Sequence, residues 1–157
     1  DSSALDLLVV VLASGRSSRL FRDLVYEQRL ARRVSADYWG LSIDPAVLSI
    51  SAQAMPGKSA AEVEHAIEKV LAKIKSGTVS ERELQKAKNQ LEADYIFRQD
   101  SVFRQGMLIG RYEISVGLKL MDRYLEEIRK LTSADLLRVA RKYLDQNRLT
   151  VGTLIPI

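Results

Sequence analysis

The residue best suited to metal chemistry in this sequence is His65, which stands in the segment Glu62-Val-Glu-His-Ala-Ile-Glu68. Glu62 and Glu68 lie three residues before and after it, so on a helix both carboxylates would flank the imidazole. A zinc ion normally takes three or four protein ligands, and a catalytic site of the His-x-x-Glu-His type needs two histidines one helical turn apart. Because the chain has one histidine and no cysteine, we predict a solvated histidine paired with Glu62 or Glu68. We predict no metal site.

The sequence also lacks the residues that other kinds of catalytic site require. The sequence has no thiol, no second histidine, no glycine-rich phosphate loop and no nucleophile elbow. A nucleophile needs a base beside it, and phosphate binding at a loop needs glycines that let the backbone approach closely. We therefore assign no catalytic residue to this chain.

Positive charge is concentrated between residues 16 and 33. This basic segment holds Arg16, Arg19, Arg22, Arg29, Arg32 and Arg33 against Asp23 and Glu27, which accounts for the net charge of +4 of the whole chain. Such a patch could bind nucleic-acid phosphates, and salt-sensitive binding in a gel-shift assay would show it. Nucleic acid is the minor alternative, because no nucleic-acid motif is present and aromatic residues make up only 6% of the chain.

The elements that must position these residues begin with a helix at Leu5–Ala13, since Leu5, Leu8 and Leu12 recur at helical spacing. Gly15 predicts a tight turn with positive φ, and Ser17 or Ser18 would then cap a second helix from Leu20. The apolar run is too short to span a bilayer and lacks the basic flank of a signal peptide. A start inside a helix suggests a piece of a longer chain with one or more strands upstream.

Two alternating runs, Val34–Trp39 and Leu48–Ala54, predict an antiparallel hairpin that is covered on one face only. Helices follow, and three capping boxes mark helix starts: Ser59/Glu62, Ser80/Glu83 and Thr132/Asp135. The segment from Glu81 towards Val116 is too long for one uninterrupted globular helix, so we expect bends or close contacts at Gly106, Gly110 and Gly117. Two helices at 118–131 and 134–144 and a final strand at 148–157 complete the chain.

The predicted fold class is α+β, an antiparallel sheet with helices packed on one face and its first strand or strands missing. A length of 157 residues suits one domain, and no linker or internal repeat divides residues 1–157. The absence of cysteine leaves the compartment unassigned.

One stretch resembles a known family over more than twenty positions without a gap. It reads Gly15-Arg16-Ser17-Ser18-Arg19-Leu20-Phe21, then Leu24, Leu30-Ala31 and Val34-Ser35-Ala36. This order is similar to the signature of the non-catalytic C-terminal domains of pitrilysin-type zinc peptidases, which include insulinase and the mitochondrial processing peptidase. The order of elements downstream agrees with such a domain over nearly the whole chain.

The resemblance implies a clamshell of two homologous halves, with zinc held by the N-terminal half and peptide bound as an added strand in a closed chamber. No cofactor is then expected in this chain, and its partner is the zinc-bearing half of the same chain or a homologous subunit, as in a heterodimer. Family members that bind substrate carry an arginine and a tyrosine, seven positions apart, that contact the peptide. Those positions hold Val25 and Arg32 here, so Arg32 is the only substrate-binding residue that we expect.

Two function classes therefore remain open. In the first, the chain is part of a peptidase and contributes chamber wall and a docking surface. In the second, it belongs to a structural core subunit that has lost proteolysis. The presence or absence of His-x-x-Glu-His upstream would separate the two.

Overall fold

The computed structural model describes residues 1–155, apart from the side chain of Arg98. The elements are α1 (Ser2–Ala13), the π-helix η1 (Phe21–Glu27), β1 (Ala31–Tyr38), β2 (Leu48–Ala54), α2 (Ala60–Ser76), α3 (Glu81–Arg98), α4 (Val102–Ser115), α5 (Lys119–Lys130), α6 (Ser133–Tyr143) and the 3-10 helix η2 (Gln146–Arg148). Their order confirms the α+β class.

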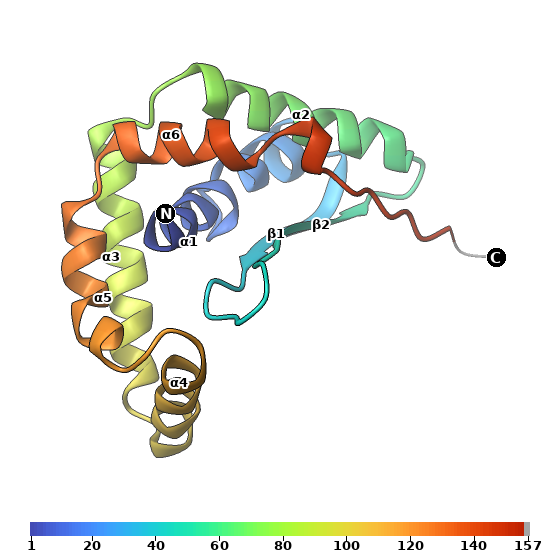
Figure 1. Cartoon of the computed structure of the whole chain (residues 1–157). Helices are drawn as coiled ribbons and strands as arrows, with labels where there is room; N and C mark the ends of the chain where they lie inside the picture. The colour runs from blue at the N-terminus through green and yellow to red at the C-terminus, as the bar shows by residue number, and fades with distance from the viewer. Residues whose placement is uncertain (156–157) are drawn as a thin grey trace.

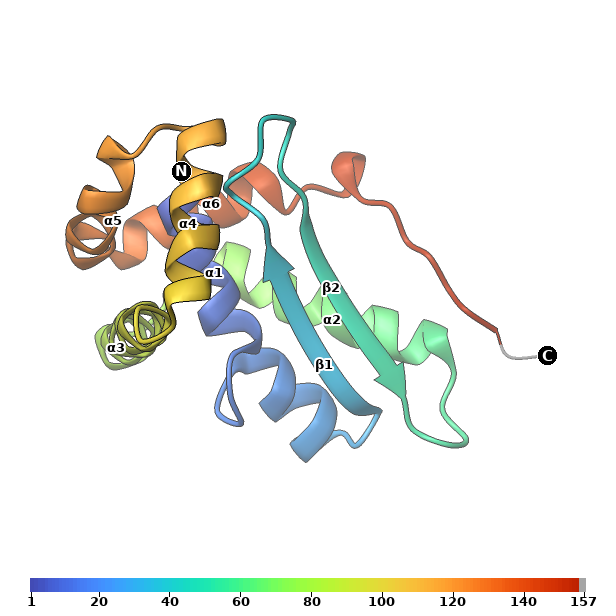
Figure 2. The ribbon, with the colours of Figure 1, turned by 90° about the horizontal axis from the view of Figure 1, so that it is seen from below.

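Strands β1 and β2 form an antiparallel hairpin in which Val34 lies opposite Ala52 and Ala36 opposite Ile50. Helices α1 and α2 lie against one face of this hairpin, and the other face is open (Figures 1 and 2). The open face carries the polar half of the alternation, namely Arg33, Ser35 and Asp37 from β1 and Ser49, Ser51 and Gln53 from β2. The predicted one-sided cover is therefore confirmed.

Helix α1 is the centre of the core. It is apolar on most of its surface, and Leu7, Leu8 and Leu12 have no solvent exposure at all. Its neighbours are β1, α3, α5 and α6, which come from both ends of the chain and surround it (Figure 1). A helix that is hydrophobic on nearly all sides is stable in water only inside such a cover.

The turn after α1 has the predicted geometry. Gly15 adopts φ +77°, and the Ser18 hydroxyl donates a hydrogen bond to the Gly15 carbonyl over 2.7 Å. The Ser18 side chain is buried, and the amide of Arg22 donates to its carbonyl over 2.9 Å, so the chain becomes helical again at Ser18. The left-handed conformation at Gly15 lets the basic segment fold back beside α1.

The capping boxes at Ser59/Glu62 and Thr132/Asp135 are both complete. Their serine or threonine bonds hold the pKa values of Glu62 and Asp135 below the ordinary range for a carboxyl group. The third box is incomplete. Ser80 accepts a bond from the Glu83 amide, but the Glu83 carboxylate binds Arg19 instead of returning to Ser80. The long-range ion pair with Arg19 thus takes the place of the bond that the Glu83 carboxylate would accept from the Ser80 amide in a complete capping box.

A bend was expected at Gly106, Gly110 or Gly117 in the long helical segment, and this was wrong for Gly106 and Gly110. The helix ends after Arg98 and restarts at Val102, because Ser101 takes an extended conformation and its side chain caps the amide of Arg104. Gly106 and Gly110 lie inside α4, whereas Gly117 does end the segment with φ +84°. The break is set by Ser101, which caps a new helix; the prediction from the glycines alone did not include this residue.

The strand expected at 148–157 does not form in the described residues. Arg148 belongs to η2, the amide of Leu149 donates back to Gln146, and residues 149–155 have no ladder partner. In Figure 2 this tail runs apart from β2. A strand exists only by pairing, so an alternating pattern without a neighbouring edge stays extended but unpaired. Residues 156–157 of the expected strand lie outside the described residues.

We predict that Gly15→Val lowers the free energy of unfolding by about 2 kcal/mol, since a β-branched residue is strained at positive φ. Space is not the cause, because a Cβ added at Gly15 would lie 3.9 Å from the nearest atom, Nε2 of Gln90. Gly106→Ala is the control. It lies in a helix with nothing within 4 Å of an added Cβ, and should stabilise by up to about 1 kcal/mol. Urea unfolding measures both, and an unchanged midpoint for Gly15→Val would contradict the strain.

Candidate functional site

The basic segment is fastened to α3 by a two-pronged ion pair. Arg19 donates through Nε and Nη2 to the two carboxylate oxygens of Glu83, each over 2.8 Å, and Nη2 also reaches the Thr78 carbonyl over 3.3 Å. The hydrogen bond to Glu83 raises the pKa of the Arg19 guanidinium. Both side chains are less than a third exposed. Arg19 therefore has a structural role and is not a free cationic group.

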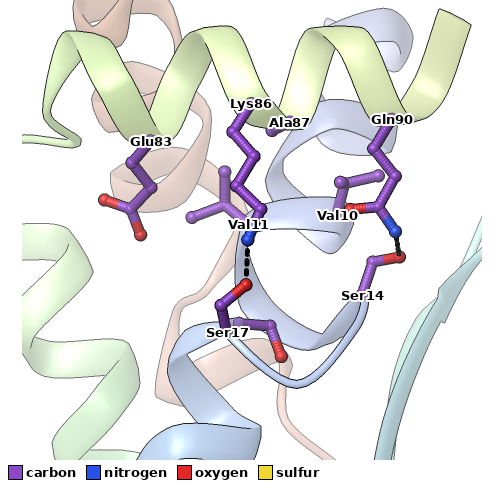
Figure 3. A pocket seen from close by; sticks show the side chains of 9 residues that line it. Val10, Val11, Ser14, Ser17, Glu83, Lys86, Ala87 and Gln90 are labelled. Atoms are coloured by element: carbon purple, nitrogen blue, oxygen red, sulfur yellow. Dashed lines mark hydrogen bonds between the residues drawn. The ribbon is translucent and has the colours of Figure 1, made fainter.

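Two further bonds along α3 hold the same turn. Gln90 donates to the Ser14 hydroxyl over 2.6 Å, and Lys86 donates to the Ser17 hydroxyl (Figure 3). The space that these residues enclose with Val10 and Val11 is about 20 Å³, enough for one water molecule. The run of polar residues in the turn thus fixes the position of the basic segment and leaves no room there for a substrate.

Arg32 occupies a special position at the start of β1. Ala31 lies opposite Ala54 and Arg33 opposite Gln53, so Arg32 is the extra residue of a β-bulge. The bulge shifts the alternation by one residue, and both Arg32 and Arg33 are exposed. Just before the strand, Arg29 adopts φ 51°, which is unusual for a residue other than glycine. Bulges of this kind re-aim side chains next to binding sites.

The remaining members of the basic segment divide into paired and unpaired groups. Arg22 lies 3.4 Å from Glu27, and both are largely exposed. Within the described part of the chain, Arg16, Arg29, Arg32 and Arg33 have no carboxylate within 4 Å. Val25, which occupies the arginine position of the family pattern, is half-buried and packs against the core. Three of the four unpaired arginines are therefore gathered at the entry to β1.

His65 behaves as a surface residue. Its Nδ1 lies 3.7 Å from the Glu68 carboxylate, and two thirds of the side chain is exposed. Glu62 is engaged in the capping box with Ser59, which leaves it unavailable as a second partner. Across residues 1–155, no group of three or more histidines and carboxylates could hold a metal ion. The pairing with Glu68 confirms the surface interpretation.

The open face of the hairpin was predicted from its one-sided cover, but its extension to Arg33 at the bulge was not. The signal was present in part, since the polar positions of β2 alternate regularly. The bulge hid the rest, because two adjacent arginines cannot both be outward in a regular strand. The described strand therefore begins at Ala31 and not at Val34 as expected, and ends at Tyr38 rather than Trp39.

The fold and these surfaces define an α+β domain with an open polar sheet face, a cationic strand entry and, among its described residues, no metal-binding cluster. The family model of the peptidase M16 inactive domain matches residues 1–91. The chain belongs to this family, and the expected relation to zinc peptidases is confirmed at that level.

Relatives agree with this assignment. The chain is 30% identical to the zinc protease PqqE of Helicobacter pylori over 156 residues, which cover 99% of this chain and 35% of that protein. A solved protease from Helicobacter pylori superposes with a TM-score of 0.86 at 30% identity, over 94% of this chain and 35% of that one. The chain thus spans about a third of the length of these relatives.

A similar fold has also been solved as a separate domain. The inactive peptidase domain of a Bordetella parapertussis protein matches with a TM-score of 0.89 at 24% identity, over 99% of this chain and 82% of that one. At this identity the match supports the fold alone. In residues 1–155, no helix combines the length and apolar character that crossing a membrane requires.

We predict that Arg19→Lys lowers the free energy of unfolding by about 1 kcal/mol, because an ammonium group keeps the charge but loses the two-pronged geometry. Arg22→Lys is the matched control. It should change the free energy of unfolding by only about a few tenths of a kcal/mol, since both Arg22 and Glu27 are mostly solvated. Chemical unfolding compares the two. Equal losses of unfolding free energy in the two variants would show that the two-pronged geometry at Glu83 does not stabilise the fold.

We also predict that the chain holds no stoichiometric zinc after dialysis, since His65 and Glu68 supply too few ligands. His65→Ala should leave both the metal content and the melting temperature unchanged. Metal analysis by mass spectrometry decides the matter, and one tightly held zinc ion per chain would overturn the prediction.

Proposed function

We propose that this chain forms part of the wall of a peptide-binding chamber in a zinc peptidase, and that Arg32 contacts the peptide. The observation that carries the proposal is the position of Arg32 on a bulge at the entry to β1, exposed and, within the described residues, without an ion-pair partner. An unpaired guanidinium donates well to peptide carbonyls and carboxylates. The catalytic zinc would belong to the N-terminal half, in the same chain or in a homologous partner subunit.

The open face of the sheet supports this role. Next to the arginines it presents hydroxyl and amide groups, among them Ser35, Ser51 and Gln53. Such a surface can hydrogen-bond an extended backbone without demanding a particular side chain, which suits a domain that holds peptides of varied sequence. The cluster of Arg29, Arg32 and Arg33 would attract acidic segments of the peptide.

The second candidate, a structural subunit without proteolytic activity, is favoured by Val25. This side chain packs against the core and has no polar atom to offer a peptide. In that case the same surface would contact another protein instead of a substrate. A zinc-loaded full-length protein that cleaves unstructured peptides would decide for the peptidase.

The test of Arg32 is direct binding of an unstructured, fluorescein-labelled acidic peptide to the 157-residue chain, followed by anisotropy. We expect Arg32→Gln to weaken binding about three- to tenfold, which corresponds to the roughly 1 kcal/mol that a typical hydrogen bond contributes. Arg16→Gln is the matched control, because Arg16 is also exposed and has no described ion-pair partner but lies in the turn and outside the sheet.

Both substitutions remove one positive charge, so net charge alone predicts equal losses. Equal weakening, or none for Arg32→Gln, would contradict the assignment of Arg32. Because this assay measures binding without zinc and without cleavage, it remains informative if the assembled protein proves inactive.

A further inference from the structure

Helix α4 stands apart from the core that forms around α1 (Figure 1). Its inward contact is Tyr112, which is 5% exposed and whose hydroxyl pKa burial raises to about 12. The opposite side of the helix should be polar if it faced only water. Instead, it carries Phe103, Met107 and Ile114, which are 77%, 50% and 71% exposed.

These three residues form a regular seam. Together with Gly110 they follow the spacing four, three, four along α4, which is the a/d repeat of a helix that packs against another helix. We name Phe103, Met107, Gly110 and Ile114 the α4 seam. Its direction is opposite to Tyr112 on the helix, so the seam and the inward contact use different faces.

Two glycines leave open space at and beside the centre of the seam. Gly110 lies within it and Gly106 beside it, and a Cβ built at either position would meet nothing within 4 Å. Glycine in the middle of a helix weakens it by about 1 kcal/mol relative to alanine. Small residues one turn apart let a second helix come close. The seam therefore has the shape of a contact surface for a helix, flat at its centre and bulky at its ends.

Charge on the flanks narrows the choice of partner. Arg104 and Arg111 follow the seam on one side, and Gly106 and Glu113 on the other. Arg111 is held over the ring of Trp39, with 5.1 Å from its guanidinium carbon to the ring centre. In the described part of the chain, no carboxylate lies within 4 Å of the Arg104 guanidinium. One flank is thus basic and unneutralised.

We propose that the α4 seam binds an amphipathic helix whose apolar stripe is flanked by carboxylates on the side that meets Arg104 and Arg111. A second copy of this chain fits poorly. In an antiparallel pair the two arginines would face the same two arginines. In a parallel pair Arg111 would face Gly106, and Arg104 would have no α4 residue opposite it, because that position falls before the start of the helix at Val102. The proposal does not depend on the proposed function, because Arg32 and the sheet face take no part in it.

Two designed helices test the proposal against the 157-residue chain by isothermal titration calorimetry at low salt. Both carry leucine at every a and d position. The first has glutamate on its flanks and the second has lysine, and in each case like charge disfavours self-pairing of the peptide. We expect the glutamate peptide to bind about tenfold more tightly than the lysine peptide. Arg104→Glu should remove or reverse this preference.

Phe103→Ser with Ile114→Ser should abolish binding of the glutamate peptide. Tyr26→Ser is the matched control, since Tyr26 is 75% exposed but lies on η1, and it should bind as the unaltered chain does. Circular dichroism confirms that each variant is folded. Equal binding of both peptides, no binding of either, or self-association of the chain that Phe103→Ser removes would overturn the proposal.

Discussion

Burial of α1 is the constraint on which the other elements depend. The helix has almost no polar side, so a strand must cover one flank and α3, α5 and α6 the others. Arg19 and Glu83 then fix the chain that leaves α1 against the helix that covers it, over 64 residues of sequence. The position of β1, and with it of Arg32, follows from these two anchors. The cationic strand entry is therefore held in place by an ion pair that lies outside it.

Much of the fold could be predicted from local signals. The hairpin, the left-handed turn at Gly15 and the complete capping boxes each depend on residues a few positions apart, and all three were confirmed. The errors arose where a distant or competing group decided the outcome. The Glu83 carboxylate binds Arg19 instead of completing the cap at Ser80. The long helix ends before Ser101, which caps the next helix, and not at Gly106 or Gly110. At the tail, residues 149–155 had the pattern of a strand but no edge to pair with.

The candidate site was less accessible to sequence reasoning. The resemblance pointed to position 32, but the bulge that turns Arg32 outward is a property of register between two strands. Pairing with Glu68 at His65 was predictable, because residues three apart on a helix are neighbours. The polar face of the sheet was likewise predictable only in part. Its alternation was visible in β2, whereas its continuation into Arg33 required knowledge of where the extra residue sits.

The central position of α1 has a consequence for synthesis of the chain. Helix α1 is made before α3, α5 and α6, yet these three helices form much of its cover. The Asp1 carboxylate has the same dependence, since it accepts bonds at 2.8 Å each from Lys142 and Tyr143, near the other end of the chain. Contacts at such separation form slowly, because a long loop must close first. A growing chain therefore carries an incompletely covered apolar helix until α6 emerges, and transiently exposed apolar surface of this kind favours aggregation.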